Sequence, residues 1–265
     1  MNTNGLTNIN IELTNKCNKS CWMCGRRKLE KKMPDFKNFY NKEMDFSLLE
    51  KISKETPFGI TVQLHNNGEP LLYSRFGDAV NLFNNQIVNI VTNGKLLLKK
   101  YDEIVENLDT LSISVFENDI ESEKQFEIIK KFLKKKGSKS PYTTLRLVGN
   151  VERQKYENLN TQIISRTLHS PMGSFEYRRD PTVPETGICL DFLNHLAINF
   201  EGNVSICVRF DPNKLGVIGN VKENTLQEIW NSEKRMEWKL SHIKGERNKV
   251  PLCSYCKFWG IPTGN

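Results

Sequence analysis

Short runs of β-branched and other apolar residues recur along the first two thirds of the chain, separated by longer amphipathic segments. Alternating or continuous apolar runs predict strands, and apolar positions three and four residues apart predict helices. The predicted strands cover residues 8–13, 59–64, 87–91, 110–116, 142–148 and 174–178. The predicted helices between them cover residues 45–55, 76–83, 98–105, 121–136 and 151–165. Strand–helix alternation of this kind predicts parallel strands joined by right-handed crossovers.

The alternation stops near residue 182, at a proline-rich stretch. Beyond it, residues 196–200 and 204–208 flank Gly202 and predict a β-hairpin. A helix capped by Asn224 or Thr225 follows the hairpin. We therefore expect an α/β fold in two parts, a partial (β/α)6 barrel and a small C-terminal domain, over residues 1–182 and 183–265.

Composition narrows the class of protein. The 265 residues, with 38% hydrophobic and 26% charged residues, provide for a sizeable core. No apolar run approaches the roughly 18–20 residues of a membrane span, and the N-terminus lacks the order of a signal peptide. We expect a cytoplasmic protein without a membrane or nucleic-acid partner, in which cysteines remain thiols or metal ligands. The net charge of +7 is modest. The basic residues 26–28, directly after a cysteine cluster, leave open a phosphate- or carboxylate-bearing substrate nearby.

Three cysteines follow the first predicted strand with the spacing C-x3-C-x2-C, at Cys17, Cys21 and Cys24. Three thiolates this close can converge on one metal centre from a single loop. Thiolates are the usual ligands of iron–sulfur clusters and also bind zinc. A four-iron cluster on three thiolates would keep one iron open, whereas a structural zinc site would need a fourth ligand. Buried thiols without a metal are the third interpretation.

This spacing, in this place, resembles the signature of the radical S-adenosylmethionine (SAM) enzymes, with Trp22 as the aromatic residue between the second and third cysteines. The resemblance implies that the open iron chelates the amino and carboxylate groups of SAM. It implies that the reduced cluster cleaves SAM to a 5′-deoxyadenosyl radical, which abstracts a hydrogen atom from the substrate. It also implies an electron donor of the flavodoxin or ferredoxin type.

Further segments resemble the family at the ends of predicted strands. Residues 67–70, Asn-Gly-Glu-Pro, are similar to the Gly-Gly-Glu-Pro motif that holds the SAM amino group, although asparagine replaces the first glycine. Residues 92–94 and 112–114 also match, and each segment taken singly is compatible with an ordinary turn or strand. The resemblance covers residues 7–180 and implies that SAM is contacted by Trp22, Asn67, Gly68, Glu69, Asn93, Ser114, Arg146 and Asn150.

The other four cysteines are Cys189, Cys207, Cys253 and Cys256. Four thiolates at one site make a closed tetrad, and spacing alone allows a zinc ribbon or an iron–sulfur centre. The pattern C-x12-G-x4-C, with Gly202 at its centre, resembles the start of the SPASM auxiliary-cluster extension. Because no cysteine follows the final C-x2-C, it resembles the shortened Twitch form with one fully ligated cluster. The resemblance thus implies a partial (β/α)6 radical SAM barrel with a small C-terminal Twitch/SPASM-like iron–sulfur domain, and SAM plus two [4Fe-4S] clusters as cofactors.

The division of the cysteines into three and four bears on the reaction. With all seven as ligands, no thiol is left to donate a hydrogen atom, which disfavours epimerisation, whereas a fully ligated cluster suits an electron acceptor. Size and cluster arrangement resemble the aminocyclitol dehydrogenases that oxidise 2-deoxy-scyllo-inosamine. We therefore expect a carbinol carbon to be oxidised to a ketone on a small-molecule substrate, namely a sugar, a cyclitol or a nucleotide-linked sugar.

Arg178 and Arg179 are the candidates for substrate contact, with surface salt bridges as the alternative. Four scattered histidines are interpreted as surface or core residues: His65, His169, His195 and His242. Two enzymatic alternatives stay open, a peptide-modifying maturase of ribosomal natural-product biosynthesis and a radical SAM epimerase. A non-enzymatic zinc-binding interaction protein is the third alternative. It predicts colourless protein with about two zinc ions, where the enzyme predicts brown protein with about eight irons.

Overall fold

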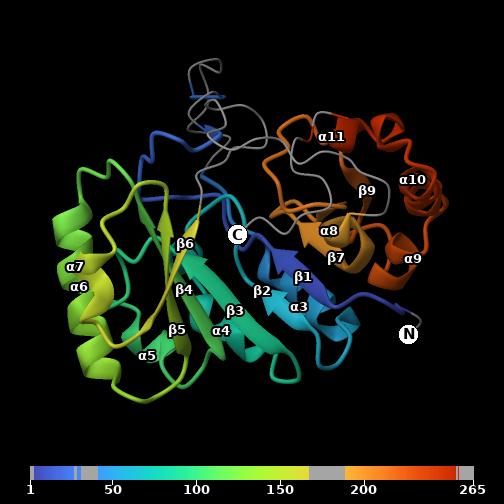
Figure 1. Ribbon diagram of the computed structural model, residues 1–265. Coiled ribbons are helices and arrows are strands. Elements are labelled where there is room, and N and C mark those ends of the chain that lie inside the picture. Colours follow the sequence, from blue (N-terminus) through green and yellow to red (C-terminus); the bar gives the residue numbers. More distant parts are fainter. Residues whose placement is uncertain (1–2, 27–28, 31–40, 167–188, 255, 257–265) are drawn as a thin grey trace.

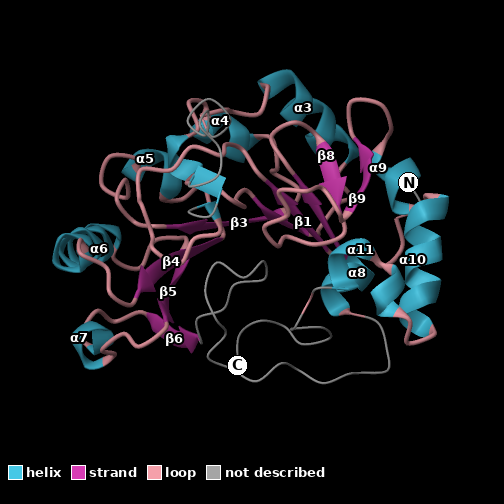
Figure 2. Ribbon diagram, turned by 90° about the horizontal axis from the view of Figure 1, so that it is seen from above, coloured by secondary structure: helices cyan, strands magenta, loops and turns pink. Residues whose placement is uncertain are grey.

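The computed structural model describes residues 3–26, 29–30, 41–166, 189–254 and 256. Six parallel strands come from the first part of the chain: β1 (Asn8–Ile11), β2 (Thr61–Gln63), β3 (Ile87–Thr92), β4 (Thr110–Phe116), β5 (Tyr142–Val148) and β6 (Gln162–Arg166). The connections between these strands include α3 (Phe46–Glu55), η1 (Pro70–Leu72), α4 (Phe76–Asn81), α5 (Tyr101–Ile104), α6 (Ser122–Lys136) and α7 (Gln154–Glu157). Figures 1 and 2 show the strands as an open arc with helices α3 to α7 outside it. The expected partial barrel of six parallel strands is confirmed.

The polar alternation along the strands explains why this arc has two different faces. Successive side chains of a strand point to opposite sides. Ile9 and Ile11 of β1 are fully buried, as are Val62 of β2 and Ile90 of β3. The intervening positions are mostly polar and line a cavity on the concave side, as Asn10 does. The sheet therefore packs its apolar face under the helices and presents polar groups inward.

Two helices illustrate how local sequence sets these elements. Asp45 caps α3 by accepting a hydrogen bond from the backbone N–H of Ser47. Helix α6 ends at Gly137, whose φ of 58° is a conformation that glycine adopts without a steric penalty.

One segment differs from its predicted structure. Residues 151–165 were expected to be helical, but the structure has only the short α7 there, followed by β6. Asn160, with a φ of 48°, turns the chain, and the two isoleucines of β6 then pair with β5. The sixth strand therefore comes earlier than expected. The strand predicted at residues 174–178, like the boundary at residue 182, lies outside the described residues.

The C-terminal part extends the same sheet. It consists of α8 (Leu190–Asn194), β7 (His195–Ile198), β8 (Asn203–Ser205), β9 (Val217–Asn220), α9 (Leu226–Trp230), α10 (Glu233–Ile243), η2 (Arg247–Lys249) and α11 (Pro251–Ser254). Strand β7 pairs in parallel with β1, and β8 and β9 follow in antiparallel. The strand order in the described residues is β6-β5-β4-β3-β2-β1-β7-β8-β9. The predicted hairpin around Gly202 is confirmed as β7 and β8.

The helix predicted after Asn224 or Thr225 is in fact two helices. Thr225 caps α9 with a capping box, and Ser232 caps α10 by accepting from the backbone N–H of Arg235. Asparagine and serine at positions 231 and 232 favour caps over helix interiors, which accounts for the break. None of the helices in the described ranges combines the length and the apolar character needed to cross a bilayer.

Candidate active site at the carboxyl ends of the strands

The three cysteines of the first group lie in the loop that follows β1, where the carboxyl ends of the parallel strands gather. All three are free, partly exposed thiols. Burial raises the pKa of Cys21, and together with the opposing effect of Lys19 and the raising effects of the neighbouring Cys17 and Cys24 it brings the pKa to about 12. These mutual effects place the three sulfur atoms in one group, as a shared centre requires.

Hydrogen bonds fasten this cysteine loop to the ends of β3 and β4. Lys19 Nζ lies 2.5 Å from Asp119 Oδ2, and both side chains are almost fully buried. The indole N–H of Trp22 donates to the carbonyl oxygen of Glu117 over 3.3 Å. Asn93 Nδ2 donates to the Asn18 side chain, 2.8 Å away. The loop is thus held rigidly over the strand ends, with Trp22 and Asn93 beside it.

The segment Asn67-Gly68-Glu69-Pro70 packs against the chain that enters this loop. A Cβ atom on Gly68 would lie 2.0 Å from the carbonyl oxygen of Thr14, so only glycine allows this approach of two backbones. The backbone N–H of Glu69 donates to the carbonyl oxygen of Lys16 over 2.7 Å. The glycine predicted to contact SAM is therefore also the residue that lets the two loops meet.

The Glu69 side chain forms hydrogen bonds within the protein. Its carboxylate is 2% exposed and accepts hydrogen bonds from Thr92 Oγ1 at 2.6 Å and from the backbone N–H groups of Asn93 and Leu71 at 2.8 and 3.2 Å. Burial raises the pKa of Glu69, while these hydrogen bonds oppose the shift. The carboxylate thereby ties the Asn67-Gly68-Glu69-Pro70 segment to the end of β3.

Gln125 was missed by the sequence analysis and connects two of the predicted SAM contacts. Its side-chain amide donates to the carbonyl oxygens of Asn93 and Ser114, over 2.6 and 2.9 Å. Gln125 is 1% exposed and shares the buried face of α6 with Ile129 and Phe132. A glutamine at an apolar position of a helical pattern is the signal that indicates such a role.

The remaining predicted site residues do not lie together in one place. Arg146 of β5 lines a cavity of about 940 Å³ on the concave side of the arc. Asn150 has an exposed side chain, and its backbone N–H donates to Glu117 Oε2 over 2.6 Å. Arg178 and Arg179 lie outside the described residues. His65 and His195 line the same cavity, a position that the sequence analysis did not reveal.

The second cysteine group converges from three separate elements. Cys189 precedes α8, Cys207 follows β8, and Cys253 belongs to α11 just before Cys256. Burial raises the pKa of Cys253, and the thiols of Cys207, Cys189 and Cys256 raise it further. Among the described residues, no three His, Cys, Asp or Glu side chains are arranged to hold a single metal ion. The two thiol groups are instead indicated by the mutual effects of the thiols on their pKa values, and their all-thiol donor sets suit iron–sulfur clusters.

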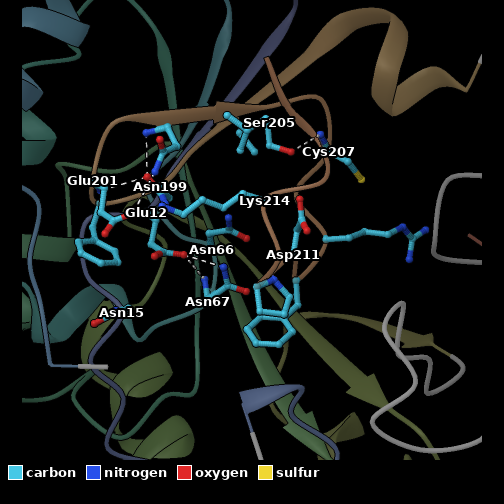
Figure 3. A pocket seen from close by; sticks show the side chains of 17 residues that line it. Glu12, Asn15, Asn66, Asn67, Asn199, Glu201, Ser205, Cys207, Asp211 and Lys214 are labelled. Atoms are coloured by element: carbon cyan, nitrogen blue, oxygen red, sulfur yellow. Dashed lines mark hydrogen bonds and ion pairs between the residues drawn. The ribbon is translucent and has the colours of Figure 1, made fainter. Parts of the chain in front are cut away.

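A small cavity of about 90 Å³ lies beside one thiol of the second group, Cys207. Its lining includes Glu12, Asn67 and Cys207, and Figure 3 shows Glu12 and Asn67 facing each other. Glu12 Oε2 accepts from both the backbone and the side-chain N–H of Asn67, at 3.1 and 2.7 Å. Phe210 also lines this cavity. A Cβ on Gly25 would lie 2.6 Å from the ring of Phe210, so the cysteine loop also meets the loop after β8.

Glu12 carries a pKa that makes protein stability depend on pH. It is 3% exposed, and burial raises its pKa from 4.5 to about 7 against the opposing effects of Asn67 and Arg26. Four charged residues share the cavity: Glu201, Arg209, Asp211 and Lys214. Between pH 4.5 and about 7 the folded protein keeps a proton that the unfolded chain has released. The free energy of unfolding therefore falls as the pH rises through this window.

Replacing Glu12 by glutamine keeps an acceptor for Asn67 and removes this titration. We compare the unfolding free energy of Glu12→Gln with that of wild type. This difference is expected to be about 2 to 3 kcal/mol more favourable to the variant at pH 8 than at pH 5. Urea unfolding of both proteins at the two pH values measures the gain. Glu43→Gln is the control. Partial burial raises the pKa of Glu43, but hydrogen bonds from Ser74 and Lys16 hold it below its ordinary value. An equal gain in both variants would contradict the role of Glu12.

Comparisons with known proteins show which proteins this chain is similar to. Residues 189–257 match the SPASM family model, described as an iron–sulfur cluster-binding domain. Over 262 residues the chain is 23% identical to an S-adenosyl-L-methionine-dependent 2-deoxy-scyllo-inosamine dehydrogenase from Niallia circulans, covering 96% of this chain and 94% of the relative.

Solved structures share the fold. The crystal structure of BtrN in complex with AdoMet and 2-DOIA matches with a TM-score of 0.59 and 18% identity, over 95% of this chain and 92% of that chain. Streptococcus suis SuiB bound to the precursor peptide SuiA matches with a TM-score of 0.64 and 12% identity, over 98% of this chain and 71% of that chain. The domain match, the sequence relative and the shared fold thus agree on what the chain is similar to, namely radical SAM enzymes with a SPASM-type iron–sulfur domain.

Proposed function

We propose that the protein is a radical SAM dehydrogenase that oxidises a carbinol carbon of a sugar, a cyclitol or a nucleotide-linked sugar to a ketone. The observation that supports the proposal is the division of the seven thiols into a group of three and a group of four, in each of which the thiols raise one another's pKa. The similarity to a dehydrogenase along nearly the whole chain supports the same reaction.

Each cysteine group has its own task in this proposal. Cys17, Cys21 and Cys24 hold a [4Fe-4S] cluster with one open iron, and the four C-terminal cysteines hold a second, fully ligated [4Fe-4S] cluster. When bound, SAM and the first cluster supply the 5′-deoxyadenosyl radical, and the second cluster supplies a one-electron acceptor. All seven thiols are then engaged, which disfavours an epimerase that needs a thiol hydrogen donor. A flavodoxin- or ferredoxin-type protein in the cytoplasm would deliver the electron for SAM cleavage.

The chain's own residues bind and orient the two reactants. Hydrogen bonds among the loops that follow β1, β2, β3 and β4 support the proposed set of SAM contacts: Trp22, Asn67, Gly68, Glu69, Asn93 and Ser114. Arg146 and Asn150 extend this set along the end of β5, and Arg178 and Arg179 remain the proposed substrate contacts. The concave cavity of about 940 Å³ is large enough for a nucleotide-linked sugar beside SAM.

Anaerobic iron and sulfide analysis, together with a product assay, tests this function. The proposal expects brown protein with about eight irons per chain, 5′-deoxyadenosine on reduction with SAM, and one ketone for each 5′-deoxyadenosine when the substrate is present. Colourless protein with about two zinc ions would refute the proposal in favour of the zinc-binding interaction protein.

The similarity to SuiB favours a second candidate, a peptide-modifying maturase. This candidate predicts a mass change in a precursor peptide incubated with reduced enzyme and SAM. A mass loss of two hydrogens from a small carbinol substrate, with no change in peptide, supports the dehydrogenase instead.

A further inference from the structure

Three residues just after β1 hold the segment 67–70, which is the proposed binding segment for the SAM amino group. Two of them act through their backbone. The carbonyl oxygen of Thr14 leaves no room for a side chain at position 68, and that of Lys16 accepts a hydrogen bond from the backbone N–H of Glu69. The third is Glu12, which contacts the segment with its side chain. Glu12 therefore supplies a contact whose chemistry depends on the type of residue at its position.

The contact between Glu12 and Asn67 has two points. A single oxygen, Glu12 Oε2, accepts from the backbone N–H of Asn67 over 3.1 Å and from its Nδ2 over 2.7 Å (Figure 3). Main chain and side chain of Asn67 are thereby tied to one atom, so neither can turn without losing a hydrogen bond. A glycine, as in the Gly-Gly-Glu-Pro motif, would offer only the backbone donor. The asparagine thus adds a second hydrogen bond to the same acceptor.

The two partners differ in their exposure. Glu12 is 3% exposed, whereas Asn67 is only partly buried. Glu12 therefore acts through Asn67, which keeps its proposed contact with SAM.

Glu12 also faces the C-terminal part of the chain. Its backbone N–H donates to the carbonyl oxygen of Ile198 over 2.8 Å. The backbone N–H of Phe200 lowers the pKa of the Glu12 carboxyl group, against the larger effect of burial, which raises it. Phe200 and Cys207 line the small cavity together with Glu12. Glu12 thus lies between the segment 67–70 and the hairpin of β7 and β8, which leads to the second cysteine group.

We propose that Glu12 is a positioning residue for SAM, because its side-chain oxygen holds Asn67, and with it the segment 67–70, in the orientation that binds the cofactor. The hydrogen bonds and not the charge have this effect, since one oxygen at the place of Oε2 meets both donors. Partners that orient metal-binding residues typically cost about 10- to 100-fold in affinity or activity when they are removed, and we expect an effect of this kind. The inference rests on the proposed function, since it requires SAM to bind at this segment.

Equilibrium binding of SAM to the cluster-loaded enzyme, left unreduced so that SAM is not cleaved, tests the proposal. Glu12→Ala removes the acceptor, and Glu12→Asp keeps the charge on a side chain one methylene too short for Asn67. Both are expected to raise the Kd for SAM about tenfold. Glu12→Gln keeps an oxygen within reach and is expected to stay within about twofold of wild type. Iron content and thermal unfolding check the folding of each variant, and Glu12→Asp still tests the proposal if Glu12→Ala does not fold.

Glu201→Gln is the matched control. Glu201 lines the same small cavity, but its carboxylate accepts from Asn203 and Lys214 over 3.0 and 2.9 Å and makes no hydrogen bond to Asn67 among the described residues. Its SAM affinity is expected to match that of wild type.

Three results would overturn the proposal. The first is wild-type SAM affinity in Glu12→Asp and in any folded Glu12→Ala. The second is a loss in Glu12→Gln as large as that in Glu12→Asp, which would assign the effect to the charge. The third is an equal loss in Glu201→Gln, which would indicate a general disturbance of the cavity. All three leave the proposed function standing, whereas wild-type enzyme that holds its full iron content and binds no SAM would refute the proposed function as well.

Discussion

Replacing Cys17, Cys21 and Cys24 together by alanine should reduce SAM cleavage to the background rate. The three thiols are the proposed ligands of the cluster that binds SAM, and no histidine or further cysteine follows them in their loop. Iron content should fall from about eight to about four atoms per chain. Measurement of 5′-deoxyadenosine after anaerobic reduction, alongside iron analysis, checks both expectations.

The fold should tolerate this triple substitution, because the three thiols are partly exposed and the loop is fastened by other groups, Lys19 to Asp119 and Trp22 to Glu117. Thermal unfolding of the metal-free proteins, followed by circular dichroism, controls for folding. A triple variant that still cleaves SAM at the wild-type rate would remove the basis for assigning this loop to the SAM cluster.

The complementary variant replaces Cys189, Cys207, Cys253 and Cys256 by alanine and should separate the two halves of the reaction. SAM cleavage should continue, because the hydrogen bonds that organise the cysteine loop come from β2, β3 and β4 and not from these thiols. Ketone formation should disappear, since the electron from the substrate radical would have no acceptor. The ratio of ketone to 5′-deoxyadenosine, measured under single-turnover conditions, reports this uncoupling.

Cys253 is buried, so its replacement also tests packing. A second variant with only the partly exposed Cys256 replaced guards against misfolding. It is expected to show the same uncoupling to a smaller extent. If the quadruple variant formed ketone as efficiently as wild type, the four-cysteine group would have no part in electron transfer.

Local patterns in the sequence predicted the features that depend on neighbouring residues. Apolar alternation located the strands from β1 to β5, and cap residues located the starts of α3 and α9. Cysteine spacing divided the thiols into two groups, and the assignment of these groups as cluster ligands stays a prediction. These features depend on side-chain periodicity, on caps and on short loops, all of which lie within a few residues along the chain.

Features that depend on distant contacts were not predicted. Strand β6 forms because its backbone pairs in parallel with that of β5, although its local sequence predicts a helix. Glu12 gains its raised pKa from burial beside Asn67, 55 residues later. The tautomer of His65 is fixed because its Nδ1 accepts a hydrogen bond from the backbone N–H of Val91. Gln125 donates hydrogen bonds to backbone carbonyl groups at the ends of two strands. In each case tertiary context supplies a property that the residue type alone does not carry.

The parallel pairing of β1 with β7 protects the half barrel from aggregation in water. All four residues of β1, from Asn8 to Ile11, align with β7, from His195 to Ile198. Without β7, β1 would be an exposed edge, and edge strands with unpaired backbone groups are sites of aggregation. The segment that carries the four cysteines therefore also seals the open side of the sheet. A variant without the four cysteines would still need this strand, or another cover, to keep the backbone of β1 paired.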